Sequence, residues 1–301
     1  MRFLENIMKL DRRWIYLLVG IAAILPFLFP LNLPVRVSEA SQKLFDRVES
    51  MNPGEVILVS FDYGPSTAPE NDPMADALIR HALQRDLRIV ALALYPIGGV
   101  NEGLEELERC VGPLDPKNGV LESAHFPGKF YGKDFIYLGY KDGGLATMKQ
   151  MNENIHEVFP TDYYGTPLDE YELMREVHGY GDLNFAFSVA TGIIGEWWAN
   201  LVNAQFGLPV AVGCTAVSAP KYFAYYRAGQ MFALLGGLKG AAEYETLVRE
   251  NYEKLDKLTT AEVFYAGKGS DVQSVVYTII TIFIVLGNIA FLAERRRKGG
   301  A

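Results

Sequence analysis

Long apolar stretches without any charge lie near both ends of the chain. The first runs from Trp14 to Val35 and the second from Val272 to Ala293, and neither contains an acidic or basic residue. At about 1.5 Å of rise per residue, each stretch is long enough to cross the roughly 30 Å hydrocarbon core of a bilayer. The pattern predicts transmembrane helices over residues 14–35 and 272–293, with the lipid bilayer as a partner.

The first stretch has a second interpretation. Pro26 and Pro30 weaken it as a regular helix, and Ser38-Glu39-Ala40 follows it with small residues where a signal peptidase would cut. The stretch is therefore either an uncleaved anchor or a cleaved signal peptide. We favour the anchor, because the apolar run is longer than a usual signal core. The second stretch has a basic cluster directly after it, which is a stop-transfer pattern.

Basic residues gather on the terminal side of each apolar stretch. Residues 1–13 hold four of them, and residues 294–301 hold four more. Positively charged flanks stay in the cytoplasm, so we expect a cytoplasmic N-terminus (residues 1–13) and a basic cytoplasmic tail (residues 294–301). Two crossings then place residues 36–271 outside the cytoplasm.

Between the two stretches, short apolar runs alternate with helical patterns. This alternation is typical of a parallel sheet with covering helices, and nearly continuous apolar strands suit a sheet buried on both faces. We predict a Rossmann-like, three-layer α/β domain with a mostly parallel, five-stranded sheet. The predicted strands are residues 55–61, 87–94, 134–140, 184–190 and 208–214, and the closing helices are residues 227–238 and 241–257.

Composition and charge narrow the class of protein. The chain has 301 residues, of which 50% are hydrophobic and 21% charged, enough for the core of one soluble domain. Without the two basic ends, 20 basic and 33 acidic residues remain, a net charge of −13. An acidic body repels phosphate backbones, so we expect no nucleic-acid partner.

Ligands of open parallel sheets bind beyond the carboxyl ends of the strands. The residues that follow the predicted strands are small and polar, as the rim of a crevice must be, but ordinary turns have the same composition. The candidate crevice consists of Asp62, Tyr63, Ser66, Thr67, Tyr95, Lys141, Asp142, Thr191, Cys214 and Thr215.

Asp62 directly follows the first predicted strand. A carboxylate there can bind a metal, accept a sugar hydroxyl or act as a nucleophile. The alternative, which we favour, is an Asx turn that satisfies the following backbone. A phosphotransferase would have a second aspartate two residues later, where this chain has Gly64.

Cys214 follows the fifth predicted strand and suggests a thiol hydrolase. A nucleophilic cysteine needs a base such as histidine within hydrogen-bond reach. His178-Gly179 is similar to the histidine motif of caspase-like peptidases, although here it precedes a strand. A cysteine that ends a core strand is more often a small buried hydrophobe. Cys110 is the only other cysteine, so one disulfide is an alternative in an oxidising compartment.

The sequence contains no CxxC, HExxH, Walker A or dinucleotide-binding motif. We therefore expect no metal and no cofactor. Small residues recur at near-helical spacing from Leu234 to Ala242. Such a face allows another backbone to approach closely, either the domain's own sheet or a second copy of the chain in a homo-oligomer.

Three stretches together resemble a family of prokaryotic membrane-anchored α/β proteins. They are residues 60–65 with 68–70, residues 163–168, and residues 229–230 with 235–244. The resemblance covers most of the soluble domain. It implies membrane anchoring but no reaction, because that family has no assigned activity, so no catalytic residue can be transferred.

These patterns predict a membrane-anchored, non-enzymatic module of the cell envelope that binds a small ligand or partner proteins. The alternative is an extracytoplasmic hydrolase that uses Asp62 or Cys214 in the strand-end crevice. Geometry separates the two. A histidine or carboxylate within hydrogen-bond distance of Asp62 or Cys214 in an open pocket favours the enzyme. Burial of both residues, with their hydrogen bonds made to the backbone, favours the binding module.

Overall fold

A computed structural model describes residues 11–29, 31, 33–96, 99–252 and 265–298. The chain forms two compact units, a domain over Val35–Ala266 and a unit made of the two terminal segments. Residues 1–10 and 299–301 lie outside the described residues, so most of the predicted N-terminal cytoplasmic segment and the end of the basic tail do as well.

The domain contains a six-stranded sheet whose neighbouring strands are all parallel, in the order β3-β2-β1-β4-β5-β6. The strands are β1 (Val56–Asp62), β2 (Arg88–Ala93), β3 (Phe135–Tyr140), β4 (Phe185–Ala190), β5 (Val210–Cys214) and β6 (Ala233–Gly236). The strand order reverses between β1 and β4, as in Rossmann folds. The α/β class and the five predicted strands are confirmed.

The sixth strand corrects the prediction of five strands. Ala233–Gly236 pairs with β5 in the place where a helix over residues 227–238 was predicted. A short apolar run without clear periodicity fits a helix and a strand equally well, and here tertiary pairing at the sheet edge decides. Among the small residues after it, Ala241 and Ala242 are fully buried and pack inside the domain. Contact of this stretch with a second copy of the chain stays a prediction.

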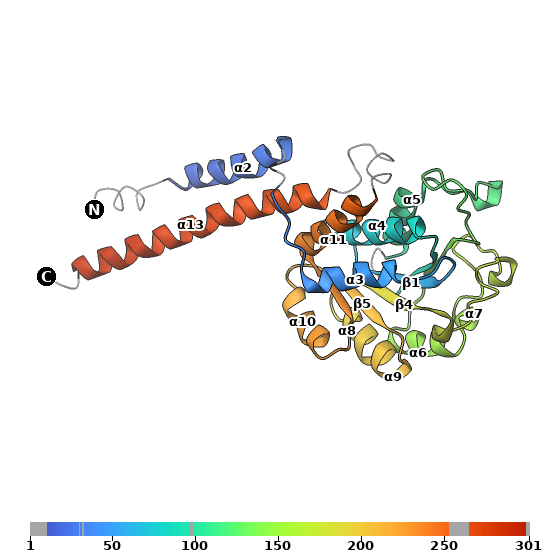
Figure 1. The fold of residues 1–301 in the computed structure, drawn as a ribbon. Helices are drawn as coiled ribbons and strands as arrows, with labels where there is room; N and C mark the ends of the chain where they lie inside the picture. Colours follow the sequence, from blue (N-terminus) through green and yellow to red (C-terminus); the bar gives the residue numbers. More distant parts are fainter. Residues whose placement is uncertain (1–10, 30, 32, 97–98, 253–264, 299–301) are drawn as a thin grey trace. The chain divides into compact units, whose positions relative to one another are not determined.

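Helices cover both faces of the sheet in three layers (Figure 1). Helices α4, α5 and α11 lie on one side, and α6, α8, α9 and α10 lie on the other. The helices are α3 (Glu39–Glu49), α4 (Ala68–Gln84), α5 (Gly99–Val111), α6 (Leu145–Glu153), α7 (Ile155–Val158), α8 (Ile194–Trp197), α9 (Ala204–Phe206), α10 (Ala219–Arg227) and α11 (Gly237–Asn251). A π-helical segment, η4 (Trp198–Asn203), joins α8 to α9, and 3-10 turns occupy 116–118, 168–170 and 180–182.

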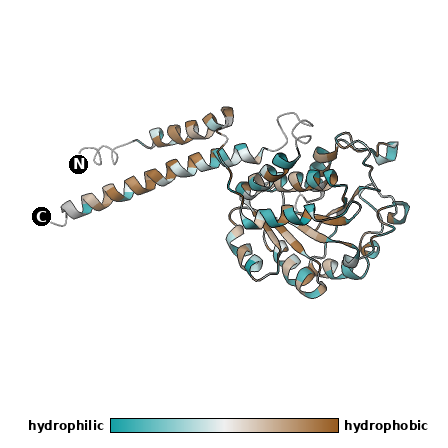
Figure 2. Ribbon diagram, in the orientation of Figure 1, coloured by the Kyte–Doolittle hydropathy of each residue, from teal (hydrophilic) through white to brown (hydrophobic). Residues whose placement is uncertain are grey.

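The terminal unit holds two apolar helices, α2 (Arg12–Leu28) and α13 (Ala266–Lys298), which appear as the long hydrophobic ribbons of Figure 2. Within the described residues, only Ala266–Ala293 is long and apolar enough to cross a membrane. The apolar part of α2 is shorter, Arg13–Pro26. The prediction of two flanking transmembrane helices is thus matched by one helix of sufficient length.

Proline explains the short first helix. The uncharged stretch continues to Val35, but regular helix ends at Leu28, just after Pro26. Proline lacks the N–H that continues a helical ladder. Seventeen helical residues span only about 26 Å, against roughly 30 Å of hydrocarbon.

Both junctions between the domain and the terminal helices contact α11 through buried carboxylates. Glu243 Oε2 accepts hydrogen bonds from Ser38 N (3.1 Å), Ser38 Oγ (2.5 Å) and Ser41 Oγ (2.6 Å). Glu245 Oε1 accepts one from Ala266 N at 3.0 Å. Ser38 is also the N-cap of α3, so signal-peptide cleavage after Ala40 would remove a residue on which the folded domain depends.

Candidate functional site

Asp62 lies at the end of β1, beside the point where the strand order reverses. Its side chain is fully buried and accepts four hydrogen bonds. Ser60 Oγ and Leu94 N donate to Oδ1 at 2.8 and 3.0 Å. Ser188 Oγ and Trp198 Nε1 donate to Oδ2 at 2.6 and 2.9 Å. Burial raises the pKa of Asp62, and these donors partly oppose that rise.

This arrangement makes Asp62 a junction between elements. Ser60 and Ser188 are register partners on β1 and β4, Leu94 follows β2, and Trp198 begins η4. A carboxylate that already accepts four hydrogen bonds and has no contact with solvent is closed to a substrate or a metal ion. Neither predicted role, the Asx turn nor the nucleophile, describes what Asp62 does here.

Side chains of the loop after β1 form hydrogen bonds within the protein. Tyr63 is buried, and its hydroxyl donates to Asp72 Oδ1 at 2.7 Å. Thr67 Oγ1 donates to Gly64 O at 3.1 Å, and Ser66 is exposed. At the start of α4, where Rossmann folds bind phosphate, Glu70 Oε2 accepts a hydrogen bond from Ala216 N at 2.8 Å.

The other predicted crevice residues do not form one site. Tyr95 packs against the core, whereas Lys141 and Asp142 are exposed. Asp142 Oδ1 accepts a hydrogen bond from Gly143 N at 2.8 Å, an ordinary turn contact. Thr191 N donates to the backbone oxygen of Asp62 at 3.0 Å. Thr191 is thus the one member of this group in direct contact with Asp62.

Cys214 is fully buried, and Thr215 beside it donates from Oγ1 to Ser218 Oγ at 3.2 Å. Burial, followed by the negative charge of Glu70, raises the pKa of the Cys214 thiol to about 12. The thiol therefore stays protonated at neutral pH and is a poor nucleophile. Cys110 and Cys214 are both free, so the predicted alternative of a disulfide is not formed.

None of the four histidines forms a hydrogen bond with Cys214 or Asp62 in the described part of the chain. His81 contacts Glu49 and Tyr244, and His125 contacts the Cys110 carbonyl. His156 contacts backbone carbonyls and the Asp169 carboxylate, and the His178 ring packs against the His156 ring. The geometry that would favour a hydrolase is therefore lacking at both residues.

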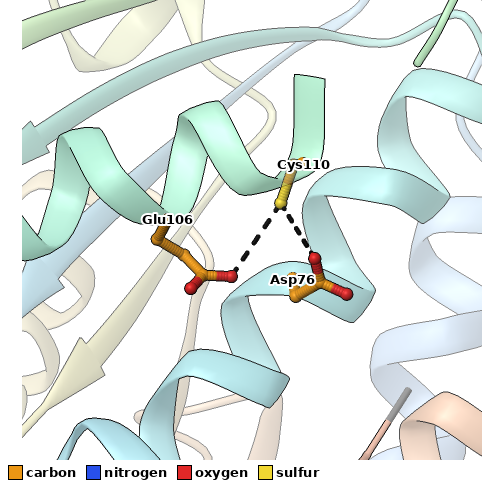
Figure 3. Close-up of side chains that lie close together, drawn as sticks. All are labelled: Asp76, Glu106 and Cys110. Carbon is orange, nitrogen blue, oxygen red and sulfur yellow. Dashed lines mark hydrogen bonds between the residues drawn. The ribbon is translucent and has the colours of Figure 1, made fainter. Parts of the chain in front are cut away.

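A buried cluster that the sequence did not reveal joins α4 to α5. Asp76, Glu106 and Cys110 each offer one possible ligand atom, and these atoms lie within 4.8 Å of one another. Figure 3 shows the Cys110 thiol between the two carboxylates, 3.2 Å from Asp76 Oδ1 and 3.9 Å from Glu106 Oε1. Among the described residues this is the one group of at least three acidic, thiol or imidazole side chains with metal-binding spacing.

Two guanidinium groups already supply the positive charge that a cation would bring. Arg80 Nε donates to Asp76 Oδ1 at 2.7 Å, and Arg109 Nη1 donates to Glu106 Oε2 at 2.5 Å. Burial, followed by nearby acidic charges, holds the pKa of Glu106 well above its ordinary value, and burial also raises the pKa of Cys110. Because its members satisfy one another, we interpret the cluster as a structural contact between the two helices.

An open groove lies on the opposite side of the sheet, between α6 and the α8–η4–α9 helix. Its volume is about 530 Å³, within the roughly 300–1,000 Å³ of small-molecule sites. Ile193 and Leu145 are half exposed, at 51% and 46%. The lining residues are Leu145, Ala146, Lys149, Ile193, Glu196, Trp197, Asn200, Leu201 and Gln205.

The groove and Asp62 are linked through one helix. Trp198, whose indole donates a hydrogen bond to Asp62, is the direct neighbour in the chain of Trp197, which lines the groove. On the facing wall, Gly144 has a φ of +52°, and a Cβ there would lie 2.9 Å from the Trp197 ring. A glycine is therefore required where α6 begins. A π-helical segment such as η4 is rare and often marks a functional site.

A second hollow lies at the β3 edge of the sheet. It has a volume of about 440 Å³ and is lined by residues 138–141 and 158–163. Lys141 is the one residue of the predicted crevice that lines either of these two hollows. The predicted crevice therefore shares one residue with the second hollow and none with the groove between α6 and α8, whose residues come from outward helix faces.

Comparison of the chain with protein-family models, with curated proteins and with solved structures gives no match.

Proposed function

We propose that the protein is a membrane-anchored, non-enzymatic module of the cell envelope that binds its ligand or partner in the groove between α6 and α8. One contrast carries the proposal. Asp62 accepts four hydrogen bonds in a closed core, whereas Lys149 and the Trp197 indole line an open hollow and have no hydrogen-bond partner among the residues that the structure describes. Binding requires accessible groups that are not already satisfied.

The alternative, an extracytoplasmic hydrolase that uses Asp62 or Cys214, has less support. Catalysis needs a nucleophile that a substrate can reach and a base in contact with it. Asp62 and Cys214 are each 0% exposed. Over the residues that the structure describes, Cys214 has no histidine or carboxylate as a hydrogen-bond partner. The donors to Asp62 are two serines, an indole and a backbone amide.

The proposal includes a two-pass topology with both termini in the cytoplasm and the domain outside. Support comes from α13, from the uncharged stretch that contains α2, and from the basic residues beyond each of them. A reporter enzyme inserted at the exposed turn around Gly119 tests the topology. Activity outside the cytoplasm supports the proposal, and cytosolic activity contradicts it.

Retention of a bound molecule tests the binding function. The full chain is released in a mild detergent, and native mass spectrometry then identifies retained small molecules, proteins and further copies of the chain. We expect the wild type to retain a molecule that Trp197→Ala loses. Val217→Ala is the matched control, because Val217 is 90% exposed and lies outside the groove. Equal retention by both variants, or none by the wild type, contradicts the proposal.

A further inference from the structure

The polar groups of the groove are divided unevenly between satisfied acceptors and free donors. Glu196 is paired with Lys221 through Oε1, and its Oε2 accepts a hydrogen bond from Tyr225 at 2.7 Å. Asn200 Oδ1 accepts one from Gln230 Nε2 at 3.2 Å. The side-chain acceptors of Glu196 and Asn200 are therefore already engaged.

The free groups of the groove are mainly donors. Lys149 is exposed and has no ion pair or hydrogen bond within the described part of the chain, and the same holds for the Trp197 indole N–H. The Gln205 amide, also free, adds a donor and an acceptor. A ligand that satisfies these groups must bring acceptors, and the ammonium of Lys149 favours a negative charge.

The local charge of the groove supports the same conclusion. Lys221 neutralises Glu196, so Lys149 gives the groove a net positive charge on an otherwise acidic protein. The rest of the lining includes apolar groups, among them Leu145, Ile193 and Trp197, and the first two are half exposed. Apolar walls with few charged groups suit a ligand that has one anionic head and a hydrophobic body.

Building on the proposed function, we propose that the groove binds a small amphiphilic carboxylate. The carboxylate accepts hydrogen bonds from Lys149 and from the Trp197 indole, and the hydrocarbon or aromatic body packs on Leu145, Ile193 and the Trp197 ring. The same chemistry belongs to medium-chain fatty acids and to aryl carboxylic acids, so the test includes one probe of each.

The test measures binding of four probes to the full chain in nanodiscs, with empty nanodiscs subtracted. The probes are octanoate, 2-naphthoate, octanol and octylammonium. We expect octanoate or 2-naphthoate to bind at least about tenfold more tightly than octanol and octylammonium, as a charge-assisted hydrogen bond implies. Tighter binding of octanoate points to an aliphatic source, and tighter binding of 2-naphthoate to an aromatic one.

Variants at lysine provide the control. Lys149→Met keeps the alkyl stem and removes the charge, so carboxylate affinity should fall about tenfold while octanol affinity stays unchanged. Lys133→Met, at an exposed lysine outside both hollows, should change neither. Equal affinity for octanol or octylammonium, or an unchanged affinity in Lys149→Met, overturns the choice of ligand. The proposed function then still stands if Trp197→Ala loses a retained molecule, and it falls separately if no molecule is retained.

Discussion

Trp198 and Trp197 are neighbours in the chain, but they lie in opposite surroundings. The indole of Trp198 is buried and donates to Asp62, which holds three other donors. The indole of Trp197 lines an open groove and has no hydrogen-bond partner in the described part of the chain. The strand-end position where Rossmann folds bind ligands is thus closed by internal hydrogen bonds, whereas the outer side of the same helix keeps the groups that can bind.

The contrast predicts that Asp62 is structural, which a substitution can test. Asp62→Ala leaves Ser60, Ser188, Trp198 and the Leu94 amide without their acceptor inside the core. We expect the free energy of unfolding to fall by about 4 kcal/mol or more, measured by urea denaturation of the full chain. Asp62→Asn keeps the shape and one acceptor oxygen, so it should lose about half as much. Normal stability in both variants would instead point to a catalytic carboxylate.

Acid should weaken the buried core while leaving the groove groups unaffected. His81 lies between the Tyr244 hydroxyl (2.8 Å) and Glu49 Oε1 (2.9 Å), and burial lowers its pKa to about 4. His81 becomes protonated below about pH 6.5 in the unfolded chain, but only below about pH 4 in the folded chain. The free energy of unfolding therefore decreases by about 3 kcal/mol as the pH is lowered from about 6.5 to about 4.

Denaturation curves between pH 7 and pH 4 measure this effect. His81→Gln should flatten the pH dependence, and Lys149→Met in the groove should leave it unchanged. An identical pH slope in wild type and His81→Gln would show that His81 is not the responsible group.

The carboxylate of Glu243 on α11, which binds Ser38 and Ser41, should also be structural, with a smaller effect on stability. Glu243→Gln weakens the hydrogen bonds from Ser38 and Ser41 and removes the ion pair with Lys239. We expect a loss of about 1–2 kcal/mol and faster proteolysis near Ser38. Glu250→Gln, at an exposed position of the same helix, is the control and should change neither. Equal stability and equal proteolysis of the two variants would show that Glu243 does not stabilise the segment at Ser38.

Cys214→Ala should have the smallest effect. The thiol is buried and has no catalytic partner, so we expect a loss of about 1 kcal/mol from reduced packing and unchanged retention of the groove ligand. Denaturation and native mass spectrometry measure the two quantities. Loss of a hydrolytic activity in this variant, at normal stability, would revive the alternative function.

Much of the fold could be predicted because parallel strands buried on both faces read as continuous apolar runs. The edge strand Ala233–Gly236 is too short to show such a run, and Pro26 does not reveal where the first helix ends. The sequence singled out Asp62 as a candidate acid, and the structure shows that its side chain is buried. Its structural role could not be predicted from the sequence, because strand register and helix packing bring the donors Ser188 and Trp198 next to it.

The groove was beyond sequence reasoning for a similar reason. Lys149 and Trp197 stand far apart in the chain, and each looks like an ordinary surface or core residue of a helix. Asp76 and Glu106 likewise read as solvent-facing positions, although both point into the contact between α4 and α5. Only the packing of the helices turns the first pair into a groove and the second into a buried cluster.

Photo-crosslinking in intact membranes tests most directly whether binding occurs at the groove. The photoreactive residue p-benzoylphenylalanine replaces Ile193 at the groove mouth in one variant and Val217, which is more exposed, in another. Mass spectrometry then determines the added mass on each protein. The account predicts a discrete adduct at position 193 and none at position 217, and equal adducts at both positions or none at 193 would contradict it.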